Sequence, residues 1–440
     1  MHLALFVTEA GMHAGGWRHP DAAPVRPFDL GFYRDLAQKA EAAKLDILFV
    51  ADKVGLDDLY GGSVGATVAR RPNARPEPVT LVSALAAVTS RIGLGATVST
   101  TYAEPYHVAR LFATIDHLSG GRVAWNAVTS VSDSEARNFG RDAHLDHTAR
   151  YARADEFIDV VRKLWDSWEE GAIAPDKATG RFADETRVHT INHDGPHFRV
   201  RGPLNVERPP QGHPVVIQAG VSGTFQDVAT RQADLVFTVH PDIGSAKRAY
   251  AAFKAQVAAH GRSPGTVKVL PGIMPILGRT DEEAQEKRAQ LRALIDPVAG
   301  LSFMSGSMNY DLSQHPLDGP FPDLRDVITG SRGRFQRVIA DALESGATVA
   351  EVGAAYVESL SFAVAAGSPV TVADTLEEWV TEGAADGFVL MPPYLPGGVD
   401  DFLTLVVPEL QRRGLFRHDY EGTTLRQHLG LERPASRYAF

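Results

Sequence analysis

Hydrogen-bonding side chains gather where several short apolar runs of this chain end. Asp52 closes one run, Thr97 lies near the end of a second, and Asn126 lies in a third. Amides and hydroxyls with a single carboxylate do not resemble hydrolytic acid–base machinery, but they could hold a neutral heterocycle by its edge. For any one of these residues, hydrogen bonding within the core or a turn is the alternative.

An apolar run over 214–220 ends at Gly220 and is followed by Ser222 and Gly223. A continuous apolar run predicts a buried parallel strand, and ligands in such folds bind at the carboxyl ends of strands. Ser222 could cap a helix over 223–232, leaving backbone N–H groups free to face an anion such as phosphate. A strand, a turn and a capped helix without a ligand are the alternative.

His147 and Tyr151 are four residues apart at the start of a helix predicted over 148–168. Side chains at this spacing share one helix face, so both could reach the same phosphate. Tyr151 also begins an apolar stripe at helical spacing, so simple burial is an equal alternative.

Other chemistries have no support in the sequence. There is no cysteine, and the 16 histidines do not form a ligand pair at zincin spacing, so we expect no metal site. No G-x-G-x-x-G motif opens a helix, and no G-x-S-x-G motif is present, so a resident dinucleotide fold and serine hydrolysis are not predicted.

These residues need elements to position them, and strand and helix patterns alternate eight times along the chain. Such alternation predicts an α/β fold, a (β/α)8 TIM barrel. The alternative is a doubly wound domain over 1–277 followed by a second domain. The predicted strands span 3–9, 45–52, 92–100, 122–129, 214–220, 234–239, 267–277 and 387–393, and the predicted helices span 29–44, 77–90, 104–118, 148–168, 223–232, 244–260, 280–294 and 371–385.

Three intervals are too long for simple loops: 53–76, 169–213 and 295–370. We predict a single barrel domain over 1–440 with these intervals as insertions at the carboxyl-end face. The second should contain a hairpin with its turn at Asp194-Gly195. The third should contain helices over 335–344 and 348–366.

The composition of the chain limits the kinds of partner that it is expected to bind. The chain has 440 residues and a formal net charge of −10, which argues against a nucleic-acid or anionic-membrane partner. No secretory leader and no run of membrane-spanning length is apparent, so a cytoplasmic location is expected.

The sequence resembles the bacterial-luciferase-like flavin monooxygenases, in particular the group of nitrilotriacetate monooxygenase component A and dibenzothiophene-sulfone monooxygenase. The likeness covers nearly the whole chain. It rests on Gly15-Gly16-Trp17-Arg18, Leu45 to Asp52, Glu77 to Leu94, Leu118 to Ser130, Asn138-Phe139-Gly140, Tyr151 to Trp168, Gly195-Pro196-His197-Phe198, Gly202 to Asn205, Gln218-Ala219-Gly220 and Leu317 to Pro322.

The resemblance implies an FMN-dependent monooxygenase. Reduced FMN would come from a separate NAD(P)H-dependent flavin reductase, and O2 would form a flavin C4a-hydroperoxide that oxygenates a small organic substrate, such as an organosulfur compound or an aminocarboxylate. Phe225 departs from the family, which usually has glycine there. The implied cofactor-binding residues are Asp52 and Thr97 near the ring and ribityl chain, His147, Tyr151 and Ser222 at the phosphate end, and Asn126, Ala219, Gly220 and Gly223.

We expect the segment 301–322 to be a mobile lid, since it combines Gly, Ser, Met and Pro with little periodicity. A stable excursion packed against a neighbouring subunit is the alternative. Trp17, Arg18, Phe303 and Met304 are the predicted substrate or lid residues. A homodimer or homotetramer is expected. Two other functions remain open: deazaflavin-dependent hydride transfer on the same barrel, and flavin binding without turnover.

Overall fold

The computed structural model describes residues 1–220 and 223–438, with the backbone alone for 223–225. Eight parallel strands form a closed barrel, because β10, at one edge of the sheet, also pairs with β11, which follows β13 toward the other edge. The predicted TIM barrel is confirmed. Its strands are β1 (His2–Val7), β2 (Ile47–Val50), β3 (Gly93–Ser99), β4 (Val123–Val128), β9 (Val215–Ala219), β10 (Leu235–Thr238), β11 (Lys268–Leu277) and β13 (Gly387–Leu390).

The last barrel strand, β13, pairs with the first. Leu3 aligns with Phe388 and Leu5 with Leu390 in a parallel register. The residues near the two ends of the sequence therefore build one sheet. This pairing excludes the alternative in which the chain splits into two domains after residue 277.

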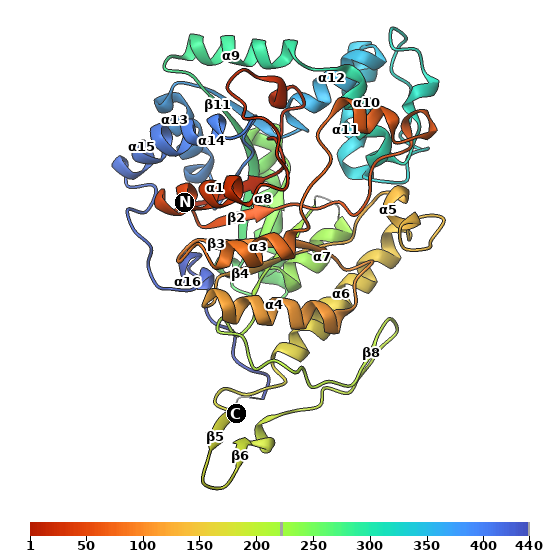
Figure 1. Ribbon diagram of the computed structural model, residues 1–440. Helices are drawn as coiled ribbons and strands as arrows, with labels where there is room; N and C mark the ends of the chain where they lie inside the picture. The colour runs from red at the N-terminus through yellow and green to blue at the C-terminus, as the bar shows by residue number, and fades with distance from the viewer. Residues whose placement is uncertain (221–222, 439–440) are drawn as a thin grey trace.

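Helices surround the barrel (Figure 1). Several begin at side-chain caps that the sequence contains: Asp29, Glu77, Thr280 and Ser368 each accept a hydrogen bond from a backbone N–H in the first turn. The helices that match predicted ones are α1 (Leu30–Ala42), α3 (Pro78–Ala86), α4 (Pro105–Ser119), α6 (His147–Trp165), α7 (Gly223–Gln232), α8 (Ile243–Ala259), α9 (Asp281–Ala293), α11 (Arg332–Ser345), α12 (Val349–Ser359) and α13 (Pro369–Thr381).

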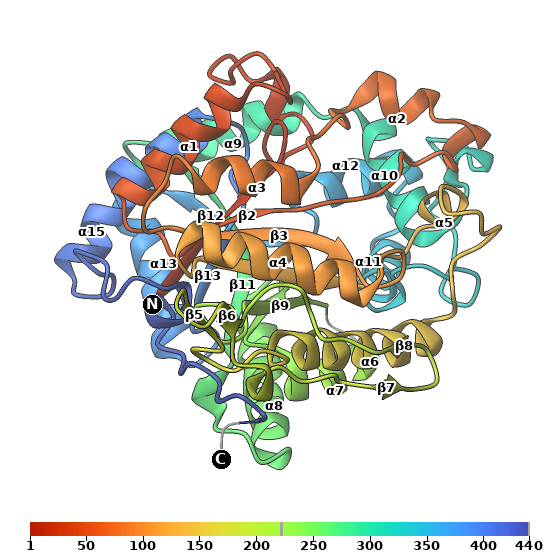
Figure 2. The ribbon, with the colours of Figure 1, turned by 60° about the horizontal axis from the view of Figure 1, so that its bottom comes forward.

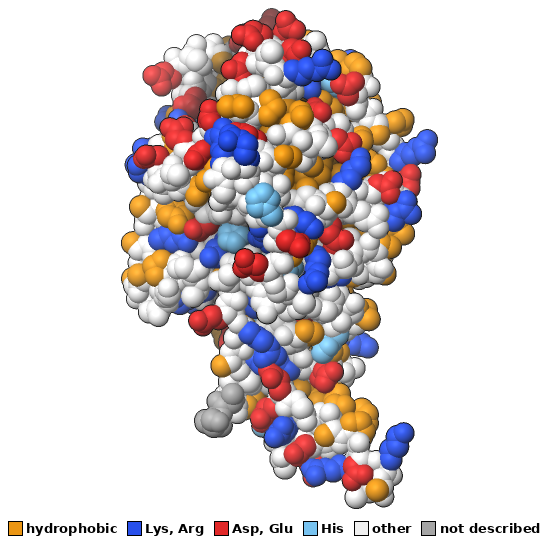
Figure 3. All heavy atoms as spheres, turned by 90° about the vertical axis from the view of Figure 1, so that its left-hand side faces the viewer, with side chains coloured by type: hydrophobic (Ala, Val, Ile, Leu, Met, Phe, Trp, Pro, Cys, Tyr) orange, Lys and Arg blue, Asp and Glu red, His pale blue; other side chains and the backbone are white. Residues whose placement is uncertain are grey.

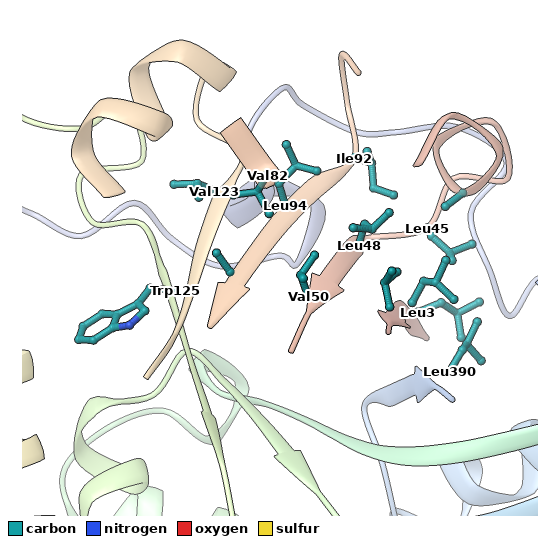
Figure 4. Packing of buried hydrophobic residues seen from close by; sticks show 14 of the residues in the cluster. Leu3, Leu45, Leu48, Val50, Val82, Ile92, Leu94, Val123, Trp125 and Leu390 are labelled. Carbon is teal, nitrogen blue, oxygen red and sulfur yellow. The ribbon is translucent and has the colours of Figure 1, made fainter. Parts of the chain in front are cut away.

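Successive side chains of each strand point to opposite faces, so the hydrophobic core has two regions, one outside and one inside the barrel. In β1, Leu3, Leu5 and Val7 face the helices, whereas Ala4 and Phe6 face the barrel interior. Figure 4 shows the outer layer, where Val82 of α3 lies over Leu94 of β3. Burying aliphatic side chains stabilises the fold by about 1.5–3 kcal/mol each.

Two small antiparallel hairpins lie between α6 and β9: β5 (Ile173–Asp176) with β6 (Arg181–Ala183), and β7 (His193–Asp194) with β8 (Arg199–Val200). The hairpin predicted in the interval 169–213 is confirmed as β7–β8, although its turn spans 195–198. The β5–β6 hairpin extends from the narrow end of the molecule (Figures 1 and 3). On the face in Figure 3, acidic and basic side chains are interspersed.

The prediction of a mobile loop over 301–322 is wrong at its start. Residues up to Met308 belong to α10 (Pro297–Met308), capped by Asp296. Leu301, Met304 and Met308 are fully buried in the inner core cluster. Because α10 packs on several sides, it lacks the apolar stripe by which a surface helix is recognised.

The predicted helix over 348–366 is also wrong in its second half. The chain reverses at Leu360 and Ser361, which both have positive φ, and β12 (Ala363–Gly367) then pairs with the later part of β11. Pairing with β11 therefore overrides the helical propensity of the alanines there.

The remaining elements are short, and no helix in the described parts of the chain is long and apolar enough to cross a membrane. They are the helices α2 (Gly65–Arg70), α5 (Asp133–Arg137), α14 (Gly397–Asp401), α15 (Val407–Arg412) and α16 (Leu425–His428), the 3-10 helices η1 (Gly16–Arg18), η2 (Tyr60–Gly62), η3 (Glu185–Arg187), η4 (Pro264–Thr266) and η5 (Leu312–Gln314), and the π-helical turn η6 (Phe402–Val406).

Candidate functional site

A cavity of about 790 Å³ opens at the carboxyl ends of the barrel strands. Figure 2 shows β3 pointing toward the side on which α5, α10 and α11 lie. Residues that follow β1, β2, β4 and β9 form the floor, and α10, α11 and α12 form a wall from the third long interval. TIM-barrel enzymes place their active sites at this face.

The structure brings seven of the predicted site residues together around this cavity. Those that line it are Asp52, His147, Tyr151, Ala219, Gly220, Trp17 and Phe303. Two of the others lie deeper: Asn126 donates from Nδ2 to Thr97 Oγ1 (3.0 Å), and Thr97 donates to the Val50 carbonyl (2.9 Å). Both are buried and do not line the cavity.

Four further predicted residues are not among those that line the cavity in the described part of the chain. Arg18 is exposed, and its guanidinium donates to the Leu294 carbonyl (2.7 Å). Met304 is buried in the core and does not line the cavity. Ser222 lies outside the described residues, and Gly223 begins α7.

His147 and Tyr151 lie at the first turns of α6, where Asp146 caps the helix by accepting from Ala149 N (3.0 Å). Their ring centroids are 4.8 Å apart. Burial lowers the pKa of His147, and the charges of Arg150 and Arg332 lower it further. A neutral imidazole beside two guanidinium groups suits a site that receives an anion.

The end of β4 is held in an unusual backbone conformation. Ser130 has φ +52°, its Oγ donates to Glu135 (3.0 Å), and its carbonyl accepts from the buried Arg150 (2.7 Å). Left-handed backbone at a non-glycine residue costs about 1–3 kcal/mol and concentrates at functional sites. The sequence gave no sign of the roles of Glu135 and Arg150, although both lie close in sequence to other cavity residues.

His13 lines the cavity with a neutral imidazole ring. Its Nδ1 accepts from Gly15 N (3.1 Å), which places the ring proton on Nε2. That Nε2 is buried, and it has no hydrogen-bond partner within the described residues. Burial lowers the pKa of His13 to about 4, so the side chain donates without being a strong acid.

Two ion-pair groups also line the cavity. Arg75 lies 3.1 Å from Glu9, which is almost fully buried, and Asp57 bonds to both Lys53 and Arg71. By residue type alone Arg18, Arg70 and Arg71 could each pair with a carboxylate, but the sequence did not single out the other four. The only signal available was a Gly-, Asp- and Arg-rich interval.

Asp52 has an unusual protonation equilibrium. Burial raises its pKa to about 6, although the N–H of Lys53 and the charge of Arg75 oppose the shift. The folded chain thus binds this proton more tightly than the unfolded chain does, so Asp52 lowers stability progressively as pH rises from about 4 to about 6.

Asp52→Asn is therefore expected to stabilise the protein more at high pH than at low pH. Its gain in free energy of unfolding should be about 1 kcal/mol larger at pH 7.5 than at pH 5. Urea unfolding of both proteins at the two pH values measures the difference. A gain that is equal at both, or larger at pH 5, would contradict the raised pKa.

Within residues 1–220 and 223–438, no group of three or more His, Asp or Glu side chains is arranged to hold a metal ion. The polar side chains that line the cavity are neutral hydrogen-bond donors, guanidinium groups and carboxylates, several of which form ion pairs with basic residues. Such a set can bind a polar ligand that carries an anionic end.

A closed (β/α)8 barrel with a large cavity at the carboxyl ends of its strands defines the TIM-barrel class of enzymes. Within that class, the chain belongs to the luciferase-like monooxygenase family, whose sequence profile matches residues 1–386. The predicted resemblance is confirmed.

Individual relatives match over nearly the full length. The chain is 46% identical to N-acetyl-S-(2-succino)cysteine monooxygenase of Bacillus subtilis (strain 168), covering 99% of this chain and 98% of the relative. It is also 46% identical to nitrilotriacetate monooxygenase component A of Aminobacter aminovorans, covering 100% and 98%. A crystal structure of riboflavin lyase with modified FMN and riboflavin superposes with a TM-score of 0.89 at 32% identity, covering 98% of this chain and 96% of that one.

Proposed function

We propose that this protein is the oxygenase of a two-component FMN-dependent monooxygenase system. It takes reduced FMN from a separate NAD(P)H-dependent flavin reductase and uses O2 to oxygenate a small organic substrate, an organosulfur compound or an aminocarboxylate. The observation that carries the proposal is the cavity of about 790 Å³ with His147 and Tyr151 on its wall, in a chain of this family.

The cavity fits FMN in size and in chemistry. Its volume lies within the range of cofactor pockets. Arg332 donates from Nε to the Ile328 carbonyl (2.7 Å), and the rest of its guanidinium has no carboxylate partner among the described residues. We assign the phosphate to Arg332, His147 and Tyr151, with Ser222 and the start of α7 as further candidates, and the ring and ribityl chain to the side of Asp52, Ala219 and Gly220.

Reduced FMN would supply the electrons with which one oxygen atom of O2 enters the substrate and the other leaves as water. The protein contributes position and water exclusion. Phe6, Trp17, Phe237 and Phe303 give the cavity apolar walls. His13 adds a neutral ring to the cavity wall, and the hydrogen bonds of Thr97 and Asn126 join β2, β3 and β4 beneath the cavity.

The name of one relative supports a partner protein. The Aminobacter aminovorans relative is called component A of its monooxygenase. A name that divides the enzyme into components agrees with a separate reductase. The homodimer or homotetramer expected from the sequence stays a prediction, which light scattering of the purified protein tests.

The central test measures oxygen use. The purified protein with FMN and NADH or NADPH should oxidise neither nucleotide at a useful rate, since no dinucleotide-binding motif is present. Adding a flavin reductase should start O2 uptake, and screening organosulfur compounds and aminocarboxylates should reveal a product that carries ¹⁸O from labelled O2.

Three outcomes would contradict the proposal. Rapid nucleotide oxidation by the protein with FMN alone would exclude the two-component arrangement. Turnover with a reduced deazaflavin in the absence of O2 would favour hydride transfer. Tight binding of oxidised FMN, with no O2 uptake beyond that of the reductase alone, would indicate a flavin-binding protein without turnover.

A further inference from the structure

The cavity is more positive than the protein that contains it. Six basic side chains and four carboxylates line it, whereas the whole chain has a formal net charge of −10. A cationic cavity in an acidic protein concentrates anions at that place. The basic residues are Lys53, Arg71, Arg75, Arg150, Arg332 and Arg334, and the carboxylates are Glu9, Asp52, Asp57 and Glu135.

Two of the guanidinium groups contact a pair of neighbouring aromatic rings, Phe303 and Tyr356. The guanidinium carbon of Arg71 lies 5.1 Å from the ring centroid of Phe303. Arg334 donates from Nη1 to the hydroxyl of Tyr356 (3.3 Å), whose ring centroid lies 6.0 Å from that of Phe303. Arg71, Phe303 and Arg334 all line the cavity. We call Lys53, Arg71, Phe303 and Arg334, which come from distant parts of the chain, the cationic corner of the cavity.

This corner has too few carboxylates of its own. Asp57 is almost fully buried and bonds to both Lys53 and Arg71, so it neutralises one of two charges. The Nε of Arg71 is buried, and no described residue accepts its hydrogen bond. Arg334 has no carboxylate partner in the described part of the chain. Positive charges outnumber carboxylates in this corner, so it favours an incoming anion.

The phosphate of FMN is not the best candidate for this corner. Arg332 lies close enough to His147 to lower its pKa, whereas Arg334 donates to Tyr356, whose ring neighbours Phe303. Ala299 and Val357 line the cavity beside Phe303 and add apolar surface. An anion bound here therefore also contacts a carbon skeleton. A guanidinium fork matches a carboxylate with two parallel hydrogen bonds.

We propose that Lys53, Arg71 and Arg334 hold a carboxylate of the substrate, while Phe303 contacts the adjoining carbon skeleton. The inference rests on the proposed function and adds a recognition site for the substrate to it. It predicts that substrates of this enzyme are carboxylic acids and that their uncharged amides bind poorly.

The test compares carboxylates with their amides on the FMN-loaded protein. Suitable pairs are N-acetylmethionine, phenylthioacetate and iminodiacetate, each with its primary amide or diamide, and binding is followed by the change in flavin absorbance. At least one carboxylate should bind about tenfold or more tightly than its amide. Arg334→Gln should remove most of that preference, because Arg334 is half-buried and has no structural carboxylate to neutralise.

Arg337→Gln is the matched control. Arg337 lies on the same helix, is exposed, and does not line the cavity, so its replacement should leave the preference unchanged. Arg71→Gln is a second variant. It removes an ion-pair partner of Asp57, so circular dichroism at the assay temperature checks that the variant is folded.

The outcomes separate the two proposals. If the native protein binds no flavin, the proposed function fails first. If it binds flavin but prefers no carboxylate over its amide, or if Arg334→Gln keeps the full preference, the carboxylate site is overturned and the proposed function stands. A preference that Arg334→Gln removes and Arg337→Gln retains supports the site.

Discussion

Gly300→Ala is expected to lower the free energy of unfolding by about 3 kcal/mol or more. A Cβ at Gly300 in α10 would lie 2.0 Å from the carbonyl oxygen of Gly353 in α12 and 3.0 Å from Val357 Cγ2. The closest atom belongs to the backbone and cannot rotate away. The two helices would have to separate, and Ala299, Phe303 and Val357 would move with the cavity wall that they form.

Urea unfolding followed by circular dichroism measures this effect. Gly65→Ala is the control, because Gly65 is exposed in α2 and its added Cβ would have only Ser63 Oγ, at 3.4 Å, nearby. That change should be neutral or slightly stabilising, since alanine favours helix. Equal stability of the two variants would show that α10 and α12 are packed less closely than in this structure.

Replacing His147 by Ala and Arg332 by Gln together is expected to weaken FMN binding by about 100-fold and riboflavin binding by less than about threefold. Each substitution removes a group that we propose binds the phosphate. Hydrogen bonds to a charged group contribute about 1.5–3 kcal/mol each. Riboflavin lacks the phosphate, so its affinity should depend little on these two side chains.

Fluorescence titration with both ligands measures the two affinities. Arg325→Gln is the control, because Arg325 is exposed and pairs with Asp323 away from the cavity. Equal losses for FMN and riboflavin would place His147 and Arg332 at the ring or in a structural role. Ser222→Ala, tested in the same way, would show whether the loop before α7 shares the phosphate.

The barrel and its order of strands were readable in the sequence. Buried parallel strands are continuous apolar runs, and the helices between them carry both periodicity and caps, as Asp29 and Glu77 show. The convergence of Asp52, His147, Tyr151 and Gly220 on one cavity was predictable, because the carboxyl ends of parallel strands meet at one face.

The two wrong predictions of secondary structure have a common physical cause. Helix α10 lacks an apolar stripe because it is surrounded, and β12 is a strand because its backbone pairs with β11. In both cases the deciding interactions are with parts of the chain that are distant in sequence. Local pattern and propensity cannot report such partners.

By itself, then, the sequence determined the barrel, the family and the strand-end residues, because these depend on local pattern and short motifs. The cationic corner is different: Arg71, Phe303 and Arg334 lie in segments that are far apart along the chain, and nothing in their spacing links them. Packing of α10, α11 and α12 over the strand ends brings them together. Partial burial of these side chains should strengthen their attraction for an anion, because electrostatic interactions grow as the local dielectric constant falls.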